Sequence, residues 1–80
     1  MQFTEGQYVS WEVRGSVTTV QLTVVTAHRI AYRSTDDYVA AVESTAFRSL
    51  AERIADWRPA TATESAGFEA RFRPGPENWN

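Results

Sequence analysis

Two runs of strand-like sequence joined by a glycine turn constrain the fold of this chain more than any other feature. In residues 7–14 apolar and polar side chains alternate, which is the period of a half-buried β-strand. The apolar members are Val9, Trp11 and Val13. Residues 17–25 are rich in threonine and valine, which favour strands. Gly15-Ser16 lies between the runs and fits a two-residue type II′ turn, so the sequence predicts a β-hairpin.

The turn also predicts how the two strands pair. It pairs Arg14 with Val17, Trp11 with Val20 and Val9 with Leu22. This register places the apolar residues of both strands on one face of the hairpin. That face holds Val9, Trp11, Val13, Thr18, Val20, Leu22 and Val24. We therefore expect Trp11 to be buried near Val20, beneath a helix.

A third strand-like run follows at residues 28–33, where Ile30 and Tyr32 continue the apolar alternation. A single strand from residue 17 to residue 33 would be far longer than strands usually are. We therefore expect a bulge, bend or tight turn near Thr26-Ala27.

Residues 34–37 have the pattern of a helix start. Ser34 can cap the helix, and Asp37 occupies the capping-box position. Apolar residues then recur every four positions, as on one side of a helix. They are Tyr38, Val42, Ala46, Leu50 and Ile54. Pro59 disfavours helical geometry at Arg58, so the predicted helix ends there.

Glu43 does not fit one continuous helix, because it falls within the apolar stripe and a buried lone carboxylate is costly. One resolution is a break at residues 43–45, with Ser44 or Thr45 capping a second helix. The other is an ion pair across the sheet. Its candidate partners are Arg29, Arg33 and Arg71.

The remaining sequence completes an α+β prediction. Residues 60–67 are small and polar and indicate a loop, and residues 68–73 alternate like a final strand. We expect one domain, 1–73, with an antiparallel sheet of three to four strands and one long or broken helix on one face. The Pro/Gly-containing tail, 74–80, cannot continue a paired strand.

Composition narrows the class of protein. The chain contains no cysteine, which removes disulfides and thiolate metal sites. A net charge of −2 selects neither an acidic nor a basic partner. The first residues lack the pattern of a signal peptide, and no apolar stretch is long enough to span a bilayer. We therefore expect a cytoplasmic protein that does not engage a membrane.

All eight basic residues are arginine, the side chain best suited to planar recognition of phosphate or carboxylate. On the predicted strands, four of them share the face opposite the helix with Tyr8. They are Arg29, Arg33, Arg71 and Arg73. Such a face resembles surfaces that bind single-stranded nucleic acid. Glu12 and Glu69 lie there too, so a solvated face with cross-strand ion pairs is the competing interpretation.

No residue pattern indicates catalysis. His28 is the only histidine and has no partner in a metal-binding or general-base motif. Asp36 and Asp37 are explained by their position at the predicted helix start. The sequence predicts no enzyme, no metal site and no cofactor.

By elimination, the sequence favours a small protein-binding module that engages another protein or a second copy of itself. A small sheet leaves two edges open for pairing. Trp79 either folds back onto its own domain or docks into a partner, since tryptophan is enriched at binding hot spots. Inhibitors, adaptors and accessory proteins of phages or mobile elements are analogies at the level of size and class. The alternative is an arginine-based binder of single-stranded nucleic acid.

Overall fold

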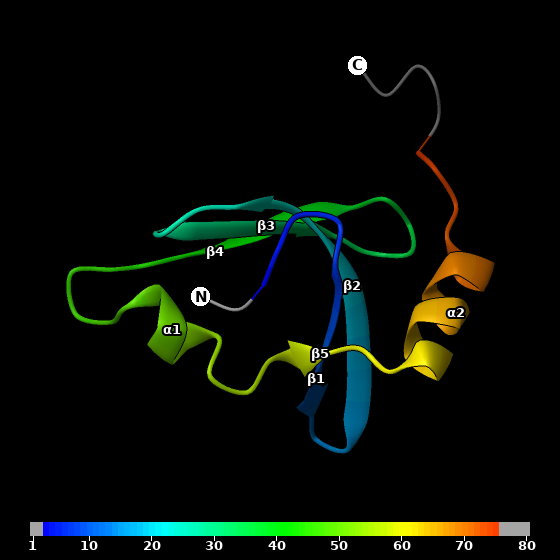
Figure 1. Ribbon diagram of the computed structural model, residues 1–80, viewed down its shortest axis with the longest axis horizontal. Coiled ribbons are helices and arrows are strands. Elements are labelled where there is room, and N and C mark those ends of the chain that lie inside the picture. The colour runs from blue at the N-terminus through cyan, green and yellow to red at the C-terminus, as the bar shows by residue number, and fades with distance from the viewer. Residues whose placement is uncertain (1–2, 76–80) are drawn as a thin grey trace.

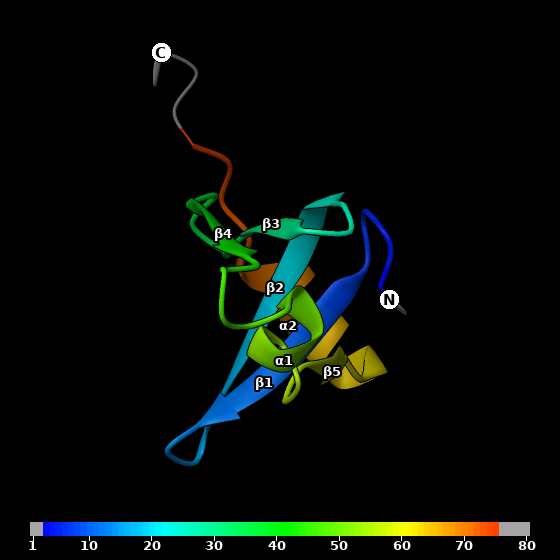
Figure 2. The same ribbon diagram turned by 90° about the vertical axis from the view of Figure 1, so that its left-hand side faces the viewer.

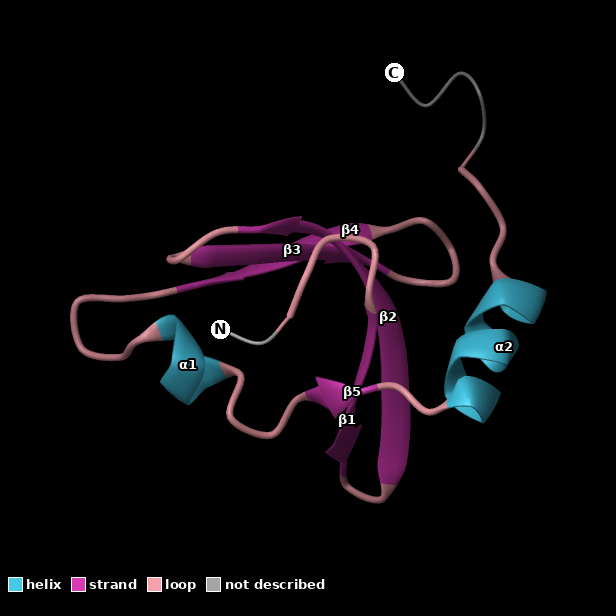
Figure 3. Cartoon of the chain, viewed as in Figure 1, coloured by secondary structure: helices cyan, strands magenta, loops and turns pink. Residues whose placement is uncertain are grey.

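A computed structural model describes residues 3–75, which form five strands and two short helices (Figures 1 and 3). Along the chain these are β1 (Tyr8–Val13), β2 (Ser16–Val25), β3 (Arg29–Arg33), β4 (Val39–Glu43), α1 (Leu50–Arg53), β5 (Arg58–Pro59) and α2 (Ala62–Arg71). The strands make one antiparallel sheet in the order β4-β3-β2-β1-β5. The α+β class is confirmed. The finer prediction was wrong: three to four strands were expected and five are present, and in place of one long or broken helix on one face there are two short, separate helices.

The predicted β1–β2 hairpin is present, but its turn and register differ from the prediction. Val13 pairs with Ser16, so the two-residue loop is Arg14-Gly15. Both loop residues have positive φ, 51° and 81°, which is the requirement of a type I′ turn. Relative to the prediction, the pairing partner of each β1 residue moves by two positions, and Val9 pairs with Val20. Because an even shift preserves the side-chain alternation, the predicted faces of the hairpin are kept as far as Leu22.

β2 is bent by a register irregularity between Leu22 and Val24. After this point Val25 pairs with Ile30 and packs against the core, while Val24 is 37 % exposed. The expected inward position of Val24 was therefore wrong. The predicted break near Thr26-Ala27 is confirmed as a tight turn, in which the Thr26 N–H donates to the Arg29 carbonyl at 2.9 Å.

The predicted helix start at Ser34 is instead the turn between β3 and β4. The Ser34 hydroxyl accepts hydrogen bonds from the backbone N–H groups of Asp36 and Tyr38, both at 3.3 Å. Asp37 has a φ of 61°, a left-handed conformation that a helix interior does not use. Serine and aspartate satisfy turns by the same side-chain bonds that cap helices, so the motif was ambiguous. The chain then returns as β4, with Val39 opposite Arg33.

Glu43 combines both alternatives left open by the sequence. It ends β4 opposite Arg29, and its Oε1 lies 3.8 Å from the arginine Nε with both side chains largely exposed. The chain breaks after it, as one alternative required. However, the segment before the break is a strand, and the following helix α1 is capped by Ser49 in a capping box with Glu52.

The last predicted strand was also wrong, because residues 62–71 form α2. The Thr61 side chain accepts the Glu64 N–H, and the Glu64 carboxylate accepts the Thr61 N–H, a complete capping box. Phe68 and Phe72 had suggested strand alternation. Their spacing of four also fits one side of a helix.

The two helices lie on opposite faces of the β1–β2 hairpin, as the two views in Figures 1 and 2 show. The face of α1 carries the main core, formed by Val9, Val20, Leu22, Ile30, Leu50 and Ile54. Aromatic residues extend this core at its margin. Trp11 is partly buried there and stacks on Trp57, with ring centroids 4.6 Å apart and an interplanar angle of 10°. Trp11 therefore packs against this indole instead of beneath a long helix.

The chain leaving α2 is tied to the β3–β4 turn. The Arg73 N–H donates to the Thr35 carbonyl at 2.8 Å, and the Gly75 N–H donates to Asp37 Oδ2 at 3.1 Å. The prediction for Trp79 falls on residues 76–80, which lie outside the described residues.

Candidate binding surfaces

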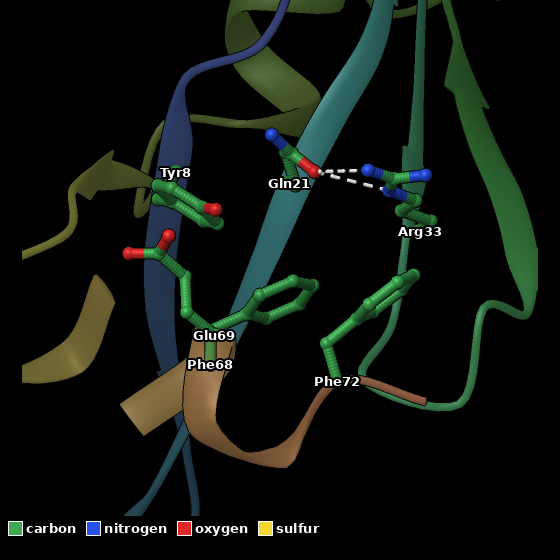
Figure 4. A pocket seen from close by; sticks show the side chains of 6 residues that line it. All are labelled: Tyr8, Gln21, Arg33, Phe68, Glu69 and Phe72. Atoms are coloured by element: carbon green, nitrogen blue, oxygen red, sulfur yellow. Dashed lines mark hydrogen bonds between the residues drawn. The ribbon is translucent and has the colours of Figure 1, made fainter. Parts of the chain in front are cut away.

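A pocket of about 220 Å³ lies between the sheet and α2 (Figure 4). Its lining comes from β1, β2, β3 and α2 with the residue that follows it, and half of the lining residues are aromatic. The residues are Tyr8, Gln21, Arg33, Phe68, Glu69 and Phe72. This volume is below that of pockets for drug-sized ligands and is suited to one side chain or one planar ring.

The aromatic wall of the pocket follows from the way α2 packs. Phe68 is only 4 % exposed and contacts Tyr8 of β1, with ring centroids 5.2 Å apart. One helical turn later, Phe72 stacks on Phe68 at 5.8 Å. The helix thus places two parallel rings over the face of the sheet that carries Tyr8.

Arg33 closes the opposite side of the pocket. Its Nε and Nη2 donate to Gln21 Oε1 at 3.0 and 2.7 Å, as Figure 4 shows. Its guanidinium also lies over the Phe72 ring, 4.8 Å from the centroid. These contacts fix the plane of the cation beside the aromatic wall.

Glu64, in the first turn of α2, joins this helix to the sheet. Its carboxylate accepts two bonds from Arg58 of β5, at 2.7 and 2.8 Å, and one from the buried Ser10 hydroxyl at 3.1 Å. Bonding to Arg58, supported by the Thr61 N–H, lowers the pKa of the Glu64 carboxyl to about 2. The same bond raises the pKa of Arg58. Since every contact of this carboxylate is internal, we assign it a structural role.

The predicted binding residues do not form one surface. Tyr8 and Arg33 meet in the pocket, and Arg29 lies on β3 beside Glu43. Arg71 is on α2, where it lines a second depression of about 430 Å³, and Arg73 follows α2 and bonds the carbonyls of residues 70 and 72. The expectation that four arginines share an open sheet face was wrong, because Arg71 and Arg73 are not on a strand and α2 covers part of that face.

The residues considered for catalysis lie in turns. His28 is exposed between β2 and β3, and Asp36 is exposed between β3 and β4. Asp37 bonds the Gly75 N–H and lies 3.9 Å from Arg33. Within residues 3–75, no group of three or more histidine, aspartate or glutamate side chains could hold a metal ion.

A second surface is the outer edge of β4, which Figure 2 shows at the margin of the sheet. Two hydrogen bonds show which backbone groups of β4 face β3. The Ser44 N–H donates to the His28 carbonyl, and the Ser34 N–H donates to the Tyr38 carbonyl. In an antiparallel ladder the residues between such pairs point their N–H and C=O groups away. The outward residues of β4 are therefore Val39, Ala41 and Glu43.

These outward backbone groups are largely unpaired. Among the hydrogen bonds of residues 3–75, one reaches them, from Arg53 Nη1 to the Glu43 carbonyl at 2.7 Å. Apolar side chains are exposed at both ends of the strand. Tyr38 is 66 % exposed and Val39 57 % at one end, and Phe47 is 94 % exposed in the loop beyond the other.

The sequence contained signals that could have located both surfaces. Two Ser/Thr-x-x-Glu patterns, Ser49 with Glu52 and Thr61 with Glu64, mark the starts of the two helices. The second pattern indicates a helix that begins after Thr61. On a helix Phe68 and Phe72 lie on the same side, and these are the two phenylalanines that line the pocket. The β4 edge has a weaker signal, because alanine and valine at residues 39–42 fit either helix or strand.

Comparison with known proteins finds no matching family model, no matching curated protein and no matching solved structure. Function must therefore be argued from the surfaces themselves. Within the part of the chain that the structure describes, neither helix is long and apolar enough to cross a membrane.

Proposed function

We propose that this chain is a non-enzymatic protein-binding module that takes up an extended segment of its partner at the β4 edge. The unpaired N–H and C=O groups of Val39 and Ala41 support this proposal. An added strand satisfies such groups by backbone hydrogen bonds, which supply affinity, while flanking side chains supply selectivity. A module of this kind serves as an inhibitor or an adaptor by occupying or joining partner segments.

The contrast between the two sheet edges favours β4 as the binding edge. The other edge, β5, consists of Arg58 and Pro59, and proline has no N–H to offer. Natural sheets protect edges with charge, proline, bulges or shortness. β5 uses several of these devices, whereas β4 is five residues long and has one charged residue, Glu43, at its end.

The partner segment is expected to be extended, weakly charged and rich in β-branched or aromatic residues. Such residues favour strands and pack against exposed apolar neighbours. At the β4 edge these neighbours are Tyr38, directly before the strand, and Val39, its first residue, with Phe47 beyond the other end.

A peptide selection with nuclear magnetic resonance readout tests the proposal. Peptides selected from a random library should protect the amides of Val39, Ala41 and Glu43 from hydrogen exchange. Ala41→Pro removes one outward N–H without removing a bond to β3, so it should abolish peptide binding with the sheet retained. Ala41→Lys provides a second disruption, and Ala66→Lys on the exposed face of α2 is the matched control for added charge. Selected peptides that leave β4 unprotected would contradict the proposal.

Single-stranded nucleic acid is the alternative ligand, and one observation favours it. The pocket brings Arg33 together with Tyr8 and Phe72, a cation beside aromatic rings that can stack a base. Glu69 in the same lining weighs against a phosphate. Anisotropy with oligo-dT and oligo-U at low salt decides this point. Binding that weakens steeply with salt and is lost in Arg33→Gln would support the alternative, whereas absence of binding at low salt would end it.

A further inference from the structure

We propose that the segment added at the edge is β4 of a second copy of this chain, in an antiparallel pair whose two-fold axis passes between the two copies of Ala41. This inference rests on the proposed function, because it uses the same edge. It goes further by naming the partner, the register and the symmetry of the complex. A two-fold dimer is the commonest closed assembly and requires one self-complementary surface.

The backbone of β4 is self-complementary in this register. Ala41 lies opposite Ala41 of the second copy, and Val39 lies opposite Glu43. All three are outward-facing residues, so each opposed pair exchanges two backbone hydrogen bonds. The Glu43 carbonyl already accepts from Arg53, and its second lone pair remains for the new bond. The methyl side chain of Ala41 allows close approach at the axis.

The charge of the strand favours an antiparallel pair over a parallel one. Glu43 is the one charged residue of β4. In the proposed register it faces Val39, and the two copies of Glu43 lie four residues apart along the ladder, roughly 13 Å. A parallel pair in equal register would place the two carboxylates side by side, which is destabilising.

The exposed apolar residues at the two ends of β4 provide the argument for a second copy as the occupant. Tyr38 directly precedes β4 and Val39 begins it, whereas Phe47 lies in the loop after the strand. Antiparallel pairing about Ala41 brings the Tyr38 end of each copy alongside the Phe47 end of the other. Both apolar groups are then covered at two symmetric places, which one short peptide strand could not achieve.

Cysteine cross-linking tests the register directly, because the native chain contains no cysteine. Directly opposed, hydrogen-bonded residues have Cα atoms about 5.5 Å apart, within the range of about 4.4–6.8 Å for a disulfide. Ala41→Cys should therefore form a disulfide-linked dimer under mild oxidation. Val39→Cys is the matched control: it is exposed on the same strand, but lies too far from its counterpart to cross-link.

Light scattering of the unmodified chain should give twice the monomer mass, and Ala41→Lys should restore the monomer mass without loss of β-sheet circular dichroism. A monomer at all concentrations, or a dimer that cross-links through Val39→Cys but not Ala41→Cys, would overturn the inference. Peptide protection of β4 in a monomeric protein would overturn the second copy as partner while leaving strand addition standing. A chain that neither dimerises nor binds a peptide at β4 would refute the proposed function as well.

Discussion

The stacked pair of Trp11 and Trp57 gives a prediction whose magnitude follows from geometry. The rings are nearly parallel at 4.6 Å, and Tyr32 lies edge-on to both at 5.6 and 5.7 Å. Trp57 directly precedes β5, which has two residues and pairs only with β1. We therefore expect the stack to carry much of the attachment of β5 to the sheet.

A double-mutant cycle with Trp11→Leu and Trp57→Leu isolates this contact. Leucine keeps an apolar side chain at each site and removes the ring. Aromatic pairs contribute about 0.5–1.5 kcal/mol beyond their buried area. The double variant should therefore lose less stability than the sum of the two single variants, by about 1 kcal/mol, equivalent to roughly 4–8 °C in Tm for a domain of this size.

Urea denaturation followed by far-ultraviolet circular dichroism measures the four free energies of unfolding. The midpoint and slope of each transition are compared instead of its amplitude, because a stacked pair of indoles itself contributes to the far-ultraviolet signal. Phe68 of α2, which is buried on the opposite face of the hairpin, supplies the independent control, since Phe68→Leu combined with Trp57→Leu should be additive. A coupling between the two indoles within about 0.3 kcal/mol of zero would refute the stacking argument.

Further predictions concern acid stability, the hairpin turn, the β3–β4 ion pair and α2. Because the folded pKa of Glu64 is about 2, below the ordinary 4.5, its contribution is present above pH 4.5 and lost as pH falls towards 2; melts across this range should fall less steeply for Glu64→Gln. Arg14→Asn should stabilise the type I′ turn by several tenths of a kcal/mol, whereas a loss of stability would favour the type II′ register. Glu43→Ala should change the free energy of unfolding by less than about 1 kcal/mol, because its pair with Arg29 is exposed, and a larger loss in urea denaturation would contradict this. Phe68→Ala should speed hydrogen exchange in α2 while β2 and β3 remain protected, and equal loss of protection in all three would contradict the separate attachment of α2.

The β1–β2 hairpin shows which parts of the fold local sequence determines. Alternation of Val9 and Trp11 with polar residues was sufficient to place the strand and its faces. The turn was misassigned because Gly15 permits positive φ at either of two loop positions, and only Arg14 in a left-handed conformation distinguishes them. The error of two residues moved the pairs but not the faces.

The second half failed for a different reason. Apolar residues that recur every four positions suggested one helix. Two members of that series, Val42 and Leu50, belong to β4 and α1 and reach the core from these separate elements. Helix propensity of the alanines in β4 is overridden by pairing with β3, a contact that the local pattern does not encode.

The sequence predicted only some of the residues that line the pocket. Tyr8 and Arg33 were chosen from their shared sheet face, and the structure brings them together. Phe68 and Phe72 were missed as pocket residues because their role depends on α2 folding over that face. Sequence patterns of one strand cannot show which later segment will cover it.

The pairing of β5 with β1 has a consequence for the order of folding. Val9 and Pro59 are roughly fifty residues apart, while every other ladder joins strands adjacent in sequence. Closing a loop of that length costs about 2 kcal/mol more entropy than closing a four-residue turn. The two residue pairs between β1 and β5 provide little stabilisation to offset this entropy. We therefore expect the meander of β1 to β4 to form early and β5 to dock late. Substitutions at Arg58 should therefore accelerate unfolding and leave the refolding rate nearly unchanged.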